Sequence, residues 1–153
     1  MGVAARMGDN MNQDDIAILK SVQRNTEMAM KAIDAIEPKV HEKELALLLA
    51  KTTQKYSNLH QKVVDSLVEA KVQPEKPSAI ENMMLVGGIN ANTLLNTSTS
   101  HIAELMIKGS NMGITDLNKT LNHHPSGQKR SMELAEELMS MEQHNLNEYK
   151  KYL

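Results

Sequence analysis

The stretch from residue 45 to residue 70 reads LALLLAKTTQKYSNLHQKVVDSLVEA, and it decides the fold class. Apolar, small or uncharged side chains recur in it at alternating steps of four and three residues, which places them on one face of a helix. They are Leu45, Leu49, Thr52, Tyr56, Leu59, Val63, Ser66 and Ala70. Heptad spacing over about four repeats is typical of helices that pack side by side with a left-handed crossing. We therefore expect a long helix from about residue 39 or 40 to residue 71.

Similar helical periods extend on both sides of this stretch, and no run of residues alternates as a strand would. Pro38 ends the preceding helix. Ser78 and Glu81 form a capping-box pattern that predicts a short helix, which Gly87 and Gly88 are expected to interrupt. The expected helices are residues 13–37, 39–71, 79–86, 89–122 and 129–152.

These elements predict an all-α, single-domain four-helix bundle over residues 13–153, preceded by a flexible tail of residues 1–12. The short helix lies in a crossover at residues 71–88. This crossover either traverses the bundle, as in ferritin-like folds, or turns back, as in an up-down bundle, and the sequence leaves both open. Gly109 and Gly113 fall inside the third long helix. We expect that helix to continue, because the two glycines share a face and let a neighbouring helix approach closely.

The composition excludes several classes of protein. The chain has 153 residues, with 17 Lys and Arg against 19 Asp and Glu, so it lacks the excess of basic charge typical of a nucleic-acid binder. It has no cysteine, which excludes disulfides and thiolate metal sites. Three tyrosines are its only aromatic residues, so it offers no base-stacking surface. The chain is methionine-rich, and we expect its 12 methionines to fill the core; the alternative is an adaptable or Cu(I)-binding surface.

The longest uncharged stretch, residues 82–103, is not expected to insert into a membrane. It contains four asparagines, several serines and threonines, and His101, whose polar groups lipid would leave unsatisfied. The start of the chain shows no apolar segment of a secretory signal. We therefore expect a cytoplasmic protein without membrane insertion.

A helical bundle with acidic residues and histidines raises the question of a di-iron centre, which needs Glu-x-x-His motifs. The residues three positions before the six histidines are Pro38, Ser57, Ser98, Thr120, Leu121 and Met141. The motif is therefore absent. His101 and Glu104 form the reverse pair and are weak candidate metal ligands, with His60 or His144 as less favoured additions. The favoured interpretation is a partly buried, hydrogen-bonded His101, and we expect no resident cofactor.

Several polar side chains fall at positions that face the core of the predicted helices. They are Asn25, Thr26, Thr52, Tyr56, Ser98 and Asn145. Buried polar groups are costly unless they are hydrogen-bonded. We interpret this set as a hydrogen-bonded layer that fixes helix register, and the alternative is the lining of a small internal cavity.

The third long helix has an unusually neutral surface along its first two thirds. Small polar residues on a helix surface suit close helix contact, and we expect a homodimer there. The candidate interface residues are Asn92, Asn96, Gly109 and Gly113. A charge at Asn92 or Asn96 should dissociate the dimer, and truncation of Leu95 or Ile102 should destabilise the fold.

Three segments resemble a group of bacterial proteins: NTEMAMKAI (residues 25–33), TSHIAELMIKGSNMG (residues 99–113) and EQHNLNEYKKYL (residues 142–153). They are similar to uncharacterised ferritin-like helical-bundle proteins of Firmicutes, of clostridial type. The resemblance implies a bundle fold and no established activity. Because the di-iron ligand motif is missing, it implies no iron chemistry for this chain.

Taken together, these patterns favour a non-enzymatic structural or interaction module that self-associates and binds an unknown protein partner. The alternative is a metal-binding or small-ligand-binding protein on a degenerate ferritin-like scaffold. No nucleophile–base pair and no phosphate-binding loop can be read in the sequence, so an enzyme is the least favoured class.

Overall fold

The computed structural model describes residues 11–76 and 78–153, and this part of the chain is helical with no strand. The expected tail lies mostly outside the described residues. Asn12, however, already caps the first helix. The helices are α1 (Gln13–Ile36), η2 (Glu37–Lys39), α2 (Lys43–Glu69), α3 (Ala79–Thr93), α4 (Thr99–His123), α5 (Lys129–Tyr149) and η3 (Lys150–Tyr152).

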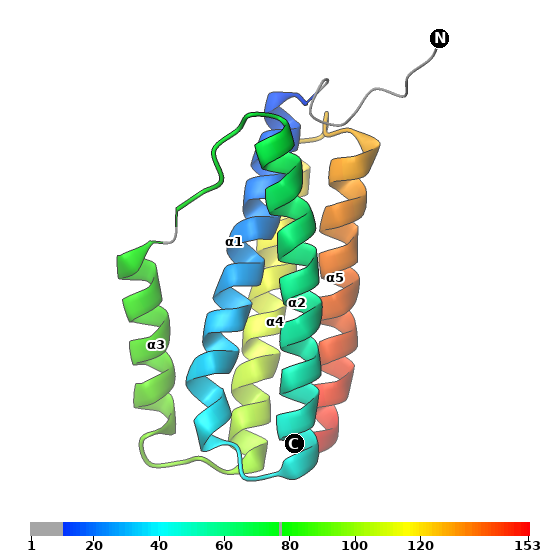
Figure 1. The fold of residues 1–153 in the computed structure, drawn as a ribbon. Helices are drawn as coiled ribbons and strands as arrows, with labels where there is room; N and C mark the ends of the chain where they lie inside the picture. The colour runs from blue at the N-terminus through cyan, green and yellow to red at the C-terminus, as the bar shows by residue number, and fades with distance from the viewer. Residues whose placement is uncertain (1–10, 77) are drawn as a thin grey trace.

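Four long helices, α1, α2, α4 and α5, lie side by side, and α3 lies outside them against α1 (Figure 1). The chain leaves α2 at the end of the bundle where α5 begins. It returns along α3 to the opposite end, where α4 begins. As a result α2 and α4 run in the same direction, joined by one long crossover. The crossover therefore does not turn straight back as in an up-down bundle.

The predicted apolar face of α2 forms the centre of the core. Six of its eight positions are buried, and the last two, Ser66 and Ala70, are half-buried. The buried six are Leu45, Leu49, Thr52, Tyr56, Leu59 and Val63. Burying one large apolar side chain contributes about 2 kcal/mol, so this face is a main source of stability. The all-α prediction is confirmed for the described residues. No helix among them is long and apolar enough to span a bilayer.

The start of α1 is fixed to the start of α5 through Asp15. Asn12 and Asp15 form a capping box, in which each side chain accepts a hydrogen bond from the other's backbone. The Asp15 carboxylate also accepts hydrogen bonds from the Gln128 backbone at 2.7 Å and the Ser131 hydroxyl at 2.8 Å. A fully buried carboxylate is tolerated here because its oxygens are satisfied.

The helix predicted over residues 89–122 begins at the wrong place. Instead, α3 continues across Gly87 and Gly88, and the break falls at residues 94–98. Ser98 caps α4 by accepting a hydrogen bond from the His101 backbone, and the Asn96 side chain accepts one from the Ser98 backbone at 3.0 Å. The hydrogen bonds of this turn stabilise a break at residues 94–98 more than the two glycines destabilise a continuous α3, which they do by about 1 kcal/mol each.

Gly109 and Gly113 do lie inside one continuous helix, as predicted. They do not, however, serve the close approach of another helix of the same chain, as the sequence analysis expected. A Cβ atom at Gly109 would meet nothing within 4 Å. One at Gly113 would make ordinary contacts, the shortest 3.7 Å to Glu142 Cδ. No helix of the described chain approaches closely enough to require a glycine at either position.

Substitutions of Leu95 and Ile102 test where α4 begins. Both were expected in the core, but Leu95 is 97% exposed and Ile102 is 1% exposed. We expect Ile102→Ala to lower the free energy of unfolding by about 3 kcal/mol. Leu95→Ala should change it by less than about 0.5 kcal/mol. Chemical denaturation of both variants checks this, and equal losses would contradict the break at residues 94–98.

Candidate functional site

A groove opens between α1, α3 and α4. Its volume is about 350 Å³, and its lining is mostly apolar. Small residues on α1 and α4 leave the space free, and two α3 side chains border it. These wall residues are Ala29, Ala32, Leu85, Ile89, Gly109 and Gly113. A largely apolar pocket of this size with a few polar groups is the usual form of a small-molecule site.

The floor of the groove consists of Tyr56 from α2, Ser110 from α4 and Glu142 from α5. All three are buried. The Tyr56 hydroxyl donates a short hydrogen bond to Glu142 Oε1. Asn145 Nδ2 donates in turn to the Tyr56 oxygen at 3.0 Å. These contacts fix the Glu142 carboxyl at the inner end of the groove.

The environment of Glu142 shifts the pKa of its carboxyl upward. Burial raises the pKa of its carboxyl, and the hydrogen bonds from Tyr56 and Ser110 only partly oppose this, so the net pKa is above its ordinary value. Burial also raises the pKa of Tyr56 and of the adjacent Tyr149, so both phenols stay neutral. The floor of the groove is therefore lined by polar groups, none of which is a cation.

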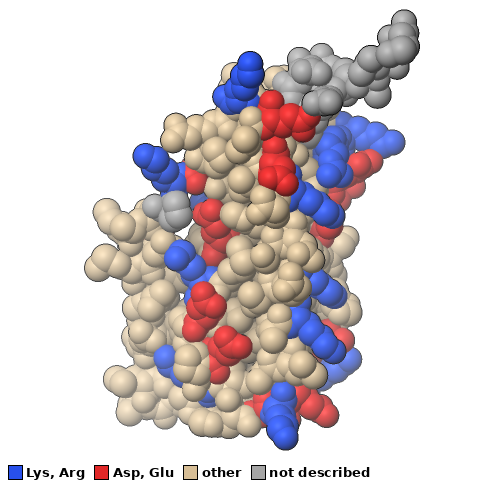
Figure 2. Space-filling model, in the orientation of Figure 1, with Lys and Arg blue, Asp and Glu red and all other residues tan. Residues whose placement is uncertain are grey.

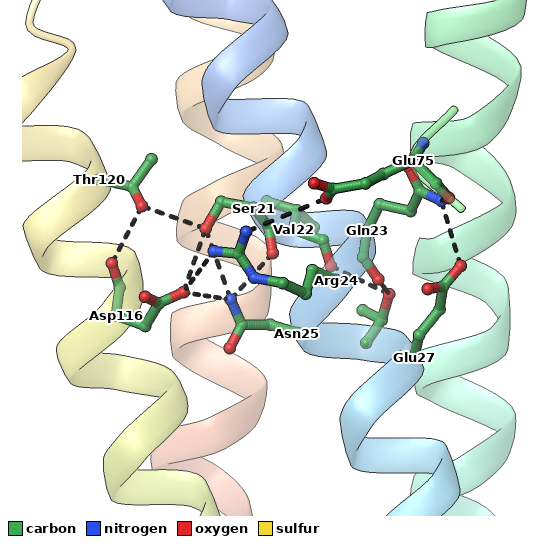
Figure 3. A network of polar contacts seen from close by, with 10 residues as sticks. Ser21, Val22, Gln23, Arg24, Asn25, Glu27, Glu75, Asp116 and Thr120 are labelled. Atoms are coloured by element: carbon green, nitrogen blue, oxygen red, sulfur yellow. Dashed lines mark hydrogen bonds and ion pairs between the residues drawn. The ribbon is translucent and has the colours of Figure 1, made fainter. Parts of the chain in front are cut away.

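The mouth of the groove is formed by Arg24 and Asn25 of α1 and by Lys108 and Asp116 of α4. Asp116 joins the two helices there (Figure 3). Its Oδ2 accepts hydrogen bonds from Asn25 Nδ2 at 2.7 Å and from the Arg24 guanidinium at 3.2 Å. Burial alone would raise the pKa of Asp116, but the hydrogen bonds from Asn25 and Arg24 outweigh it and hold the pKa below its usual value.

The link between α2 and α3 is held against α1 by Gln23. Its side chain donates to the Glu75 carbonyl at 2.8 Å and accepts from the Glu75 backbone N–H at 3.0 Å (Figure 3). Gln23 also donates to Glu27 at 3.1 Å, and His60 of α2 donates to the same carboxylate oxygen at 2.9 Å. His60 thus helps to fix this link to the bundle.

The candidate metal ligands are not brought together as a group of three or more in the described residues. His101 Nε2 donates to the Asn92 carbonyl at 2.9 Å, which secures the turn between α3 and α4. Its Nδ1 lies 3.6 Å from the nearest Glu104 oxygen. His144 pairs with Glu148 at 3.8 Å on α5. No group of three or more His, Asp or Glu side chains suited to a metal ion occurs in the described part of the chain.

The four candidate interface residues fall into two places. Asn92 and Asn96 are exposed at the end of α3 and in the turn after it. Gly109 and Gly113 border the groove instead. The sequence of α3 and the turn after it has no charged residue beyond Glu81, and Figure 2 shows a mostly neutral surface on the side of the molecule where α3 lies. Its exposed apolar side chains are Ile80, Met83, Met84, Leu94 and Leu95.

The predicted layer of buried polar side chains is largely present, although its one carboxyl group, Glu142, was not predicted. Thr26, Thr52, Tyr56 and Asn145 are buried, Asn25 is half-buried at the mouth, and Ser98 is an exposed cap. Glu142 was overlooked because a glutamate is rarely buried. Its spacing was the available signal: it follows Leu138 by four residues and precedes Asn145 by three.

No family model, no curated protein and no solved structure matches the chain. These results neither support nor contradict the resemblance to clostridial ferritin-like proteins. What the groove does must therefore be inferred from its own chemistry.

Asp116→Asn tests the contacts at the mouth. A depressed pKa in the folded state means that the ionised carboxyl stabilises the fold above its unfolded-state pKa, and that this is lost as pH falls through the folded pKa. Allowing for partial exposure, we expect the variant to lose about 1 kcal/mol of unfolding free energy at pH 7. The difference should shrink as pH falls below about 4. Denaturation curves across this range check it, and Asp34→Asn, on the exposed side of α1, is the control.

Proposed function

We propose that the protein binds a small, mostly apolar molecule in the groove between α1, α3 and α4. The observation that supports this most strongly is the presence of small side chains at Ala29, Ala32, Gly109 and Gly113, which keep about 350 Å³ open beside the core. Protein interiors are normally close-packed, and an unfilled apolar space forfeits dispersion contacts. An occupant would restore those contacts.

The glycines strengthen this argument because the backbone does not require them. Neither Gly109 nor Gly113 has a positive φ angle, and neither is in a close helix contact. Each glycine within a helix costs about 1 kcal/mol relative to alanine. Two such costs on the wall of one groove are explained if larger side chains would block what binds there.

We further propose that the scaffold is ferritin-like, as the resemblance implied. The single long crossover, with α2 and α4 running in the same direction, supports this topology. Between the helices of this bundle lie Tyr56, Ser110 and Asn145 beside one carboxyl, Glu142. This donor set suits a hydrogen-bonding organic ligand better than a di-iron centre, which needs several carboxylates and histidines.

Self-association through the outer face of α3 is a second candidate function. Ile80, Met83 and Met84 on this face are each more than 70% exposed. No charged residue occurs between Glu81 and Glu104, so the same face of a second copy could approach without charge repulsion. A large exposed apolar patch of this kind commonly marks a protein interface.

The groove is tested by filling it. We expect naphthalene, a small apolar hydrocarbon, to bind the wild-type protein with one-to-one stoichiometry in equilibrium dialysis. Gly113→Leu should lower its affinity at least about tenfold, because the new side chain occupies the inner groove. Gly87→Leu is the matched control, since Gly87 lies on α3 with open space around it. Unchanged binding by Gly113→Leu, or no binding by the wild type, would contradict the proposal.

The second candidate is tested by the mass of the protein in solution. We expect light scattering to give a dimer for the wild type and a monomer for Met84→Glu, because two buried carboxylates would face each other across the interface. A charge at Asn92 should act in the same way. Leu47→Glu on α2, where the leucine is also exposed, is the control and should remain dimeric. A monomeric wild-type protein would exclude this function.

A further inference from the structure

Two polar groups of the groove lie beside Gly113, one from its floor and one from its mouth. A Cβ atom at this glycine would lie 3.7 Å from Glu142 Cδ and 3.8 Å from Asn25 Oδ1. Both distances are ordinary van der Waals contacts, so an atom placed beside Gly113 touches both groups without a clash. A molecule that reaches this point meets a carboxyl group and an amide oxygen together.

The hydrogen bonds around Glu142 determine what its carboxyl can still do. Because Asn145 donates to the Tyr56 oxygen, the Tyr56 proton points to Glu142 Oε1. The Ser110 hydroxyl also hydrogen-bonds this carboxyl, which lowers the pKa of Glu142. Tyr56 thus supplies a donor to Glu142 and accepts nothing from it, so a neutral carboxyl has a proton to give to an acceptor in the groove.

The charges near the groove do not favour an ionised Glu142. Tyr56 of α2 and Tyr149 of α5 face it and are neutral. From α1, Arg24 is already paired with Asp116 and Glu75, at 3.2 and 3.9 Å. From α4, Lys108 is exposed at the mouth, and α3 contributes apolar Leu85 and Ile89 to the groove. A buried carboxylate without a paired cation is costly, so Glu142 holds its proton to a higher pH than an exposed glutamate does.

Asn25 supplies the complementary group. Its Nδ2 donates to the Ser21 carbonyl at 2.8 Å and to Asp116 at 2.7 Å, so the orientation of the amide is fixed. This orientation turns Oδ1 toward Gly113. Beside Gly113 the groove thus offers one donor, the Glu142 carboxyl, and one acceptor, the Asn25 oxygen.

We infer that the groove selects a neutral, apolar molecule with a single hydroxyl group, whose oxygen accepts a hydrogen bond from Glu142 and whose proton is donated to Asn25 Oδ1. The inference rests on the proposed ligand-binding function and specifies the class of ligand. A hydroxyl group satisfies both partners at once. An ether satisfies only Glu142, and a hydrocarbon leaves both polar groups unpaired, which is unfavourable in a buried site.

Three probes of nearly equal size test this inference: naphthalene, 2-methoxynaphthalene and 2-naphthol. We expect 2-naphthol to bind the wild type about tenfold more tightly than naphthalene, with the methoxy compound between them. Glu142→Gln keeps a donor and should keep this order. Glu142→Met removes the donor and should bring the affinity for 2-naphthol down toward that for naphthalene. Naphthalene binding by each variant shows whether the groove is intact.

The pH dependence gives an independent readout. The donor exists only while Glu142 holds its proton, so the preference for 2-naphthol should be full at low pH and should fall as pH rises through the raised pKa of Glu142. This decrease should occur at a pH well below the pKa of 2-naphthol itself, which is a phenol with a pKa near that of tyrosine, about 10. In Glu142→Gln the preference should not change over this range.

The outcomes separate the two proposals. If all three probes bind with equal affinity, or if the methoxy compound equals 2-naphthol, the inferred ligand class is wrong and the groove remains a binding site. A preference that strengthens as pH rises would overturn it too, because it would require an ionised Glu142. If none of the probes binds, the proposed function fails, and the inference fails with it.

Discussion

The crossover between α2 and α4 is the constraint on which the rest of the structure depends. The 27 residues of α2 span about 40 Å, and the chain must cover this length again before α4 begins. The 15 residues of α3 cover about 22 Å of it. Because the four long helices already fill the core, α3 lies outside against α1. The groove is the space that α3 borders beside the small residues of α1 and α4.

Hydrogen bonds hold this crossover at both ends, which explains several residues that suggested other roles. Gln23 binds the backbone of Glu75 before α3. After α3, His101 binds the carbonyl of Asn92. Lys39 contacts the Asn90 side chain at 2.8 Å. Nε2 of His101 is thus engaged in a hydrogen bond that stabilises the turn after α3, and it could not bind a metal ion at the same time. Between these ends α3 packs through Leu85, Ile89 and Thr93, at steps of four residues.

The sequence predicted the long helices well because their signal is local and repeated, as the buried positions of α2 show. It placed the break before α4 wrongly because Gly87 and Gly88 are a strong local signal, whereas the Asn96 and Ser98 turn acts through specific hydrogen bonds. The groove could not be predicted, since it depends on how α1, α3 and α4 are rotated relative to one another. Glu142 had the right spacing, but its residue type argued against burial.

The placement of the tyrosines has a spectroscopic consequence. The chain contains three tyrosines and neither tryptophan nor phenylalanine, and two of the three, Tyr56 and Tyr149, are buried beside Glu142. Aromatic absorption above 270 nm, which in proteins comes from tyrosine and tryptophan, therefore arises largely from the interior of the bundle next to the groove. The near-ultraviolet spectrum and tyrosine emission of this protein therefore report, without a label, mainly on two buried phenols, and one of them, Tyr56, is hydrogen-bonded to Glu142.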